Sequence, residues 1–155
     1  MNMEIQAALD VADETDAFLQ ITDVIYDKEA EAGYDELSEA EQTVYCIDSL
    51  LREMENGGFA QFFHHDSGAN TADTMEALER IRSSQVLAVF HKVVSFFPEG
   101  EVPKDEDDRI SLFDHIESEM TDEIAACDDQ FYDADENLIG LTLTFVSKNL
   151  KAFRG

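Results

Sequence analysis

The cluster in this sequence best suited to chemistry is His64-His65-Asp66. Imidazole and carboxylate groups are metal ligands. Neighbouring residues on a helix point about 100° apart, so His64 and His65 cannot easily bind one ion from the same helix. The spacing of His91 and His115 predicts no further ligand. We therefore predict that the histidines lie at the surface or at the core edge, and that the protein holds no metal and no cofactor.

Two acidic runs, Asp105-Glu106-Asp107-Asp108 and Asp133-Ala134-Asp135, resemble calcium-binding loops. An EF-hand loop needs Gly at its sixth position and Glu at its twelfth. Counted from Asp105 these positions hold Ile110 and Ile116, and counted from Asp133 they hold Leu138 and Thr144. The sequence therefore predicts no dedicated calcium site.

Other catalytic patterns are missing from the sequence. With 36 acidic residues, no carboxylate pair can be singled out for acid–base catalysis. There is no Gly-rich phosphate loop and no nucleophile motif. The two cysteines, Cys46 and Cys127, are far apart and are predicted to be buried free thiols. We predict a protein that is not an enzyme; the enzyme alternative requires His64, His65, His91 and His115 to converge with acids in a pocket.

Charge is the outlying feature of the composition, because the net charge is -26 in 155 residues. Residues 1–55 carry 16 acids and 2 bases, residues 56–104 carry 6 and 4, and residues 105–155 carry 14 and 4. A nearly neutral, aromatic middle is thus flanked by two acidic arms. Such a charge argues against direct binding of nucleic acid or an anionic membrane, since both need Lys and Arg to neutralise phosphate. The absence of a signal peptide and of a long apolar run predicts a cytoplasmic protein.

The elements that carry these groups are predicted to be helices. The hydrophobic fraction is 44% and there are only 2 Pro, which favours an all-α, single compact domain over residues 1–155 with about seven to eight helices. The run near residues 85–97 is apolar nearly all round and is predicted to be the central buried helix. Segment 138–147 alternates like a strand but also fits a helix, and the helix is favoured because no second strand is available. The other predicted helices are 1–12, 15–32, 38–55, 59–65, one capped by Asn70 or Thr71, and 109–120, which restarts at Thr121 or Asp122 and continues to about residue 132.

The chain is predicted to turn a corner at residues 56–65. Ser38 and Glu41 form a capping box that starts the preceding helix, and Gly57 is predicted to end it in a left-handed conformation. Phe59, Phe62 and Phe63 then share one face of the next helix. We interpret this corner as an aromatic anchor.

A set of short motifs resembles a known family. The motifs are Tyr45-x-x-Asp48-x-Leu50, Glu55-Asn56-Gly57-Gly58-Phe59-x-Gln61-Phe62-Phe63, Ser67-Gly68, Ala77-Leu78, Phe97-Pro98, Arg109, Asp128-Asp129-Gln130-Phe131-Tyr132 and Asn149. Together, over roughly residues 15–150, they resemble a bacterial all-helical domain family of unknown function that includes a neisserial acidic DNA-mimic protein.

The resemblance implies a helical protein-interaction domain that occupies the DNA-binding surface of a transcription factor or other DNA-binding protein. The expected partner is therefore basic, and a homodimer is compatible with this role. The family-motif residues are predicted to be structural: Asn56, Gly57, Gly58, Phe59, Gln61 and Phe62. The candidate interaction surface consists of acidic residues: Asp16, Asp23, Asp27, Glu31, Asp105, Glu106, Asp107, Asp108, Asp128 and Asp129. The alternative is an acid-rich housekeeping or immunity-type domain whose charge serves only solubility.

Overall fold

The chain begins with two capped helices in the computed structural model, which describes residues 2–153. Helix α1 spans Met3–Ala8, and the Asn2 side chain accepts hydrogen bonds from its first backbone amides. Helix α2 spans Glu14–Ala32 and is capped by Asp13. Its apolar positions bury against the core, while Asp16, Asp23, Asp27 and Glu31 are exposed. A 3₁₀ turn, Tyr34–Glu36, leads out of α2.

The longest helix, α3, spans Glu39–His64 and starts at the predicted capping box of Ser38 and Glu41. It consists of two helical parts that meet at a kink, where Gly57 and Gly58 leave the helical conformation. The prediction of two helices separated by this glycine pair is therefore confirmed, and the two parts together are called α3. A 3₁₀ segment, Asp66–Asn70, follows it.

Helices α4 (Thr71–Arg80) and α5 (Ser84–Val94) follow. Neither predicted cap works through its side chain: Asn70 makes no capping bond, and the Thr71 hydroxyl donates to the Gly68 carbonyl at 2.6 Å. Helix α5 buries Val86, Val89, Phe90, Val93 and Val94 but exposes His91 and Lys92. The 3₁₀ turn Pro98–Gly100 comes after α5.

The chain closes with α6 (Glu106–Glu119), α7 (Thr121–Asp133), α8 (Leu138–Lys148) and a 3₁₀ turn, Leu150–Ala152. Segment 138–147 is helical, as favoured. The described chain, residues 2–153, thus contains eight α-helices and no strand, which confirms the all-α prediction.

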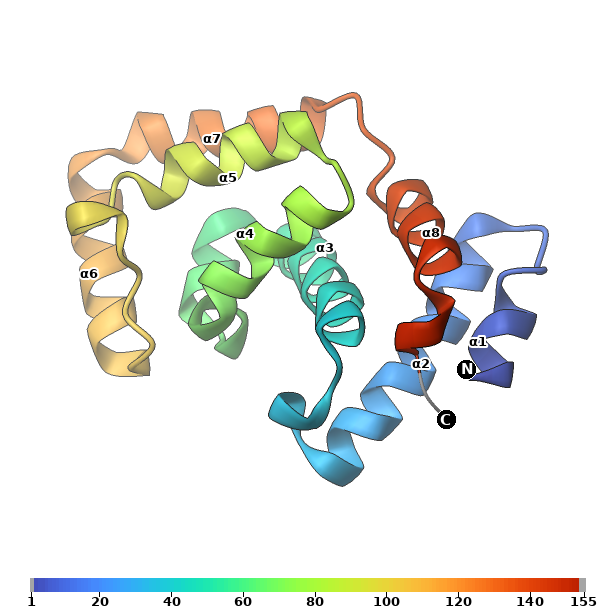
Figure 1. Cartoon of the computed structure of the whole chain (residues 1–155). Helices are drawn as coiled ribbons and strands as arrows, with labels where there is room; N and C mark the ends of the chain where they lie inside the picture. Colours follow the sequence, from blue (N-terminus) through green and yellow to red (C-terminus); the bar gives the residue numbers. More distant parts are fainter. Residues whose placement is uncertain (1, 154–155) are drawn as a thin grey trace.

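The centre of the domain is α3, not the predicted helix near residues 85–97. Helix α3 packs against α2, α4, α6, α7 and α8, whereas α5 packs mainly against α4 and α7. Figure 1 shows α5 and α7 side by side along one edge, with α6 at one end and α1, α2 and α8 at the other. The two ends of the described chain meet, since the Asn2 amide donates to the Phe153 carbonyl at 2.6 Å.

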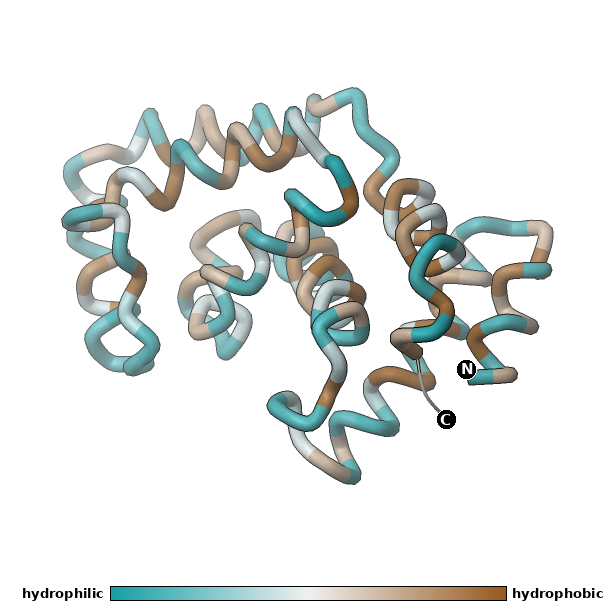
Figure 2. The backbone as a smooth tube through the Cα atoms, in the orientation of Figure 1, coloured by the Kyte–Doolittle hydropathy of each residue, from teal (hydrophilic) through white to brown (hydrophobic). Residues whose placement is uncertain are grey.

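The core is a stack of phenylalanines around the second half of α3. The Phe63 ring contacts the rings of Phe97 and Phe113 at centroid distances of 5.0 and 5.3 Å, and the Phe62 ring contacts Phe90 at 5.5 Å. All five rings are almost fully buried. Figure 2 shows hydrophobic and hydrophilic residues alternating along most of the helices, the pattern of helices with one buried face. Within residues 2–153, no helix combines the length and the apolarity needed to cross a membrane.

Candidate functional site

The kink of α3 is built by Gly58 and by side chains of α7. The prediction placed the left-handed residue at Gly57, but Gly57 has φ 178° and it is Gly58 that has φ 72°. The helix resumes at Phe59, whose free amide donates to Asp128 Oδ1 at 2.9 Å. On the other side of the kink, the Tyr132 hydroxyl donates to the Met54 carbonyl. Side chains of α7 therefore bond to one backbone group of α3 on each side of the kink.

Asp128 is consequently not a free surface carboxylate. It is half-buried, and burial raises the pKa of its carboxyl above the usual range although the Phe59 amide acts in the opposite direction. A Cβ atom on Gly58 would lie 2.7–2.8 Å from the Asp128 carboxylate. The Asp128 bond to Phe59 thus needs glycine at residue 58 for space as well as for backbone conformation.

The C-terminal end of α3 is closed by Arg109, which is 1% exposed. Its guanidinium donates to the carbonyls of Phe63 at 2.8 Å, His65 at 3.1 Å and Lys104 at 2.9 Å, with a longer bond to Pro103. A cation at this end offsets the partial negative charge of the helix carbonyls. These bonds explain how the buried guanidinium is tolerated, because backbone carbonyls accept from its N–H groups.

A polar cleft of about 450 Å³ lies beside this end of α3. It is lined by residues of α2, α3 and α6 and of the segment after α3: Tyr26, Tyr45, Ser49, Arg52, Glu53, His64, His65, Asp66, Ser67 and Glu106. His64 Nε2 lies 2.7 Å from Asp114 Oδ1. His65 Nδ1 lies 2.9 Å from Glu53 Oε2, a buried oxygen that makes no hydrogen bond within the described residues. The two groups form an ion pair when the imidazole is protonated. Both histidines line the cleft, but only His65 meets an acid that also lines it, because Asp114 is not among the lining residues.

The remaining histidines are elsewhere. His91 is exposed on α5, and His115 on α6 lies 3.5 Å from Glu119 of the same helix. In the described part of the chain, no three His, Cys, Asp or Glu side chains are arranged to hold a metal ion. The enzyme alternative requires all four histidines in one pocket, but only His64 and His65 line the polar cleft.

Sequence reasoning missed a row of three tyrosines, two of which, Tyr26 and Tyr45, line the cleft. The ring of Tyr45 lies 5.0 Å from Tyr26 and 5.2 Å from Tyr34, measured between centroids. The Tyr26 hydroxyl donates to Asp48 Oδ2 at 2.6 Å, and Arg52 Nε lies 2.8 Å from the same oxygen. Burial raises the pKa of Asp48, and burial together with the Asp48 carboxylate raises the pKa of Tyr26.

A signal for this group was present in the sequence. Asp48 stands four residues after Val44 and three before Leu51, inside the apolar stripe of α3. A buried acid at such a position needs a partner. The nearby thiol of Cys46 lies 3.3 Å from the Tyr34 hydroxyl, and burial raises its pKa to about 11. Cys46 and Cys127 are both free and buried, as predicted.

The predicted acidic residues lie on three helices. Those of α2 are exposed on one helical face, because Asp16, Asp23, Asp27 and Glu31 repeat at helical spacing. Asp105 caps α6 by accepting from the Asp108 amide at 3.0 Å, and Glu106, Asp107 and Asp108 are exposed in its first turn. Asp129 is exposed on α7.

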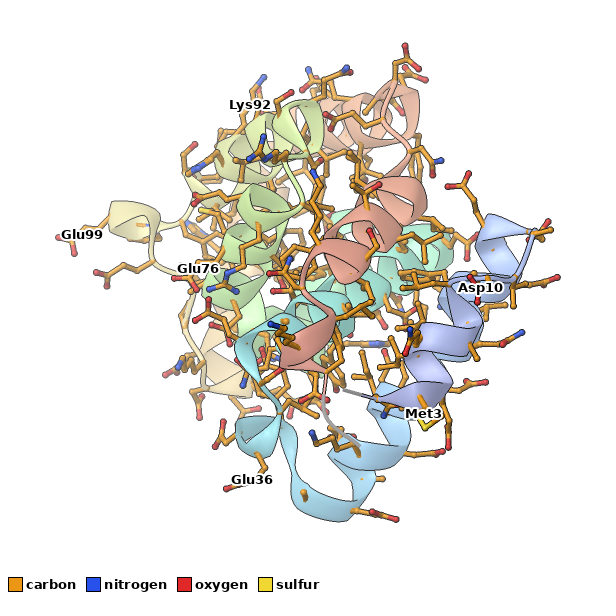
Figure 3. The ribbon with its side chains drawn as sticks, turned by 45° about the vertical axis from the view of Figure 1, so that its right-hand side comes forward. Met3, Asp10, Glu36, Glu76, Lys92 and Glu99 are labelled. Atoms are coloured by element: carbon orange, nitrogen blue, oxygen red, sulfur yellow. The ribbon has the colours of Figure 1, made fainter. Side chains whose placement is uncertain are left out.

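Acidic side chains also point away from other parts of the molecule. Figure 3 shows Asp10, Glu36 and Glu99 extending outward from separate segments. Among the predicted acidic residues, Glu106 of α6 lines the polar cleft, and α2 contributes Tyr26 to the same lining. The predicted acids of α2 are exposed but are not among the lining residues, so the predicted acids do not gather at one cleft.

One of three comparisons with known proteins found a match. The model of one family, described as DMP19-like protein, matches residues 35–149. The match starts later than the expected limit near residue 15, so α1 and α2 lie outside it. The searches of curated proteins and of solved structures found no match.

Proposed function

The chain belongs to the DMP19-like protein family, the family of a neisserial DNA-mimic protein, and from this premise we propose that it binds the DNA-binding surface of a transcription factor or other DNA-binding protein. Family membership is the observation that carries the proposal. The net charge of -26 supports it, since the partner's surface must be basic. In this proposal the acids replace the phosphates of DNA.

The charge density along α2 supports the same proposal. This helix and its cap carry seven acids between residues 13 and 31: Asp13, Glu14, Asp16, Asp23, Asp27, Glu29 and Glu31. At about 1.5 Å rise per residue the segment is about 27 Å long, so there is one acid per roughly 4 Å. One strand of duplex DNA carries one phosphate per about 3.4 Å. The one base of the segment, Lys28, forms an ion pair with Glu41, with 3.0 Å between Lys28 Nζ and Glu41 Oε1.

A rigid support matters as much as the density. Helix α2 is held against the core by Phe18, Ile21 and Ile25, each at most 2% exposed. Carboxylates on a rigid helix lose less conformational freedom on binding than carboxylates on a mobile loop, so their binding costs less free energy. The exposed acids in the first turn of α6, Glu106, Asp107 and Asp108, add a second group of carboxylates.

The proposal is tested by capture and then by competition with DNA. Immobilised protein is incubated at low salt with lysate of the organism that encodes it, and bound proteins are eluted by a salt gradient. A captured DNA-binding protein is then bound to fluorescent duplex DNA and titrated with the soluble acidic protein. We expect DNA-binding proteins to be enriched, to elute with salt, and to release their DNA.

A charge-matched pair of variants separates a specific surface from bulk charge. The test variant neutralises Asp16, Asp23, Asp27 and Glu31 by Asn or Gln; the control neutralises the exposed acids Asp10, Glu99, Glu101 and Asp122. We expect the test variant to bind at least tenfold more weakly than the control. Equal loss in both variants would assign the effect to net charge, and failure to capture DNA-binding proteins would favour the alternative of an acid-rich domain.

A further inference from the structure

An apolar groove lies between α2, α3, α7 and α8 and shares the residue Arg52 with the polar cleft. Its volume is about 400 Å³. The apolar side chains that line it are Phe18, Leu19, Leu51, Met54, Phe131, Tyr132 and Ile139. Leu19 is 45% exposed and Tyr132 is 54% exposed. Among residues 2–153 only one other large apolar side chain is exposed, Met3, so most of the large exposed apolar side chains gather in this groove.

Such a concentration needs an explanation in a protein of this charge. Exposed apolar side chains that cluster in a hollow mark interaction sites more often than scattered ones do. The two exposed walls also have acids at their edges. On α2, Asp16 lies three residues before Leu19 and Asp23 lies four residues after it. On α7, Asp129 lies three residues before Tyr132 and Asp133 follows it directly. All four acids are exposed. The groove is therefore an apolar strip between two acidic edges.

The charged residues that line the groove add no unpaired positive charge to it. They are Asp48, Arg52 and Glu55. Arg52 is paired with Asp48 at 2.8 Å, which leaves Glu55 without an opposite charge among the three. A second copy of the chain does not suit these edges, because each copy carries a net charge of -26 and like charges oppose docking.

We propose that this groove binds an amphipathic helix of a basic partner protein, with the apolar side chains of that helix on Leu19 and Tyr132 and its Lys or Arg residues on the acidic edges. The complementary pattern is an apolar face flanked by bases at helical spacing. The inference rests on the proposed function, because it gives the DNA-binding partner a specific anchor in addition to the phosphate-like charges. Acids alone would bind any basic surface, whereas the groove selects one that also presents apolar side chains.

The test uses a fluorescent 18-residue peptide with leucines on one helical face and lysines on the other, and a control peptide of the same composition in scrambled order. Binding is followed by fluorescence anisotropy. The test variant is Leu19→Gln and the matched control is Met3→Gln, since Met3 is 82% exposed and lies outside the groove. Figure 3 shows Met3 at the rim of the molecule on α1. Neither substitution changes the net charge.

We expect the amphipathic peptide to bind more tightly than the scrambled one. Leu19→Gln should weaken it about three- to tenfold, the factor expected from covering the exposed half of a leucine side chain, and Met3→Gln should leave it unchanged. Equal binding of both peptides, or equal effects of both substitutions, would overturn the inference. Self-association that Leu19→Gln abolishes would also overturn it, because the occupant would then be a second copy.

This result is independent of the test of the proposed function. If DNA-binding proteins are captured and lose their DNA while Leu19→Gln binds the amphipathic peptide as the natural chain does, the groove inference fails alone. If the peptide binds with the expected dependence on Leu19 but no DNA-binding protein is captured, the proposed function fails and the groove remains a site for basic helices.

Discussion

Replacing Gly58 by alanine tests how the kink of α3 is held. The backbone at Gly58, with φ 72° and ψ -158°, is one that side-chain-bearing residues rarely adopt, at a cost of about 1–3 kcal/mol. The new Cβ atom would also lie 2.7 Å from Asp128 Oδ1 and displace that carboxylate from the Phe59 amide. Losing a hydrogen bond to a charged group costs about 1.5–3 kcal/mol. We expect Gly58→Ala to lower the free energy of unfolding by about 3–5 kcal/mol.

The assay is urea and thermal unfolding followed by circular dichroism. For a chain of this length the melting temperature should fall by about 2–4 °C per kcal/mol, so a fall near 10 °C is expected. Gly57→Ala is the matched control, because Gly57 is extended in φ and its Cβ atom would need only a small shift of the Gln61 side chain, 3.1 Å away. We expect this control to cost less than about 1 kcal/mol.

A double-mutant cycle separates the two causes. In an Asp128→Ala background the steric conflict is gone, so Gly58→Ala should cost only the backbone strain of about 1–3 kcal/mol. Strictly additive costs would show that residue 58 does not act through Asp128. A Gly58→Ala protein within about 0.5 kcal/mol of the natural one would refute the account of the kink altogether.

Three further predictions concern charge and capping. Arg109→Lys cannot reach all the carbonyls at the end of α3 and should lose about 2–4 kcal/mol in urea unfolding, whereas the exposed Arg82→Lys should lose almost nothing. Glu136 caps α5, because its carboxylate accepts a hydrogen bond from the Val86 amide at 2.9 Å. Burial acts to raise the pKa of Glu136, but the hydrogen bonds from Val86 and Ser83 have the larger combined effect and lower that pKa. Glu136→Gln should therefore cost about 1 kcal/mol at pH 7, and the difference should vanish as the pH falls through the lowered pKa, which thermal melts across pH can check. Repulsion among the acids predicts a melting temperature that rises between low salt and 1 M salt, where the screening length is about 3 Å, and a flat profile would contradict this.

Local patterns in the sequence were sufficient for most of the helices. The capping box of Ser38 and Glu41 and the apolar spacing in α2 both act within a few residues, so the sequence alone predicts them. Segment 138–147 was ambiguous because Leu and Thr alternate there, and the preference for a helix came from the absence of a strand partner.

The central helix and the kink could not be predicted in the same way. A helix apolar on nearly all sides was expected at the centre, but α5 exposes His91 and Lys92 and packs at the edge, because α7 covers its apolar face. The glycine pair predicted the break in α3, but not that Asp128 and Tyr132 of α7 bond to the backbone on its two sides. The candidate site follows the same division: exposed acids on α2 were predictable from periodicity, whereas the polar cleft and the apolar groove were not.

The sequence by itself determined the helical content, the strong acidity and the aromatic corner, since each depends on composition or on spacing of three to four residues. Only the tertiary structure decided which helix is central, that Asp128 closes the α3 kink instead of facing solvent, and that Leu19 and Tyr132 meet in one groove. The physical reason is distance along the chain: Asp128 is 69 residues from Phe59, and Tyr132 is 78 residues from Met54. No periodicity reports contacts of that separation, because they depend on how whole helices pack.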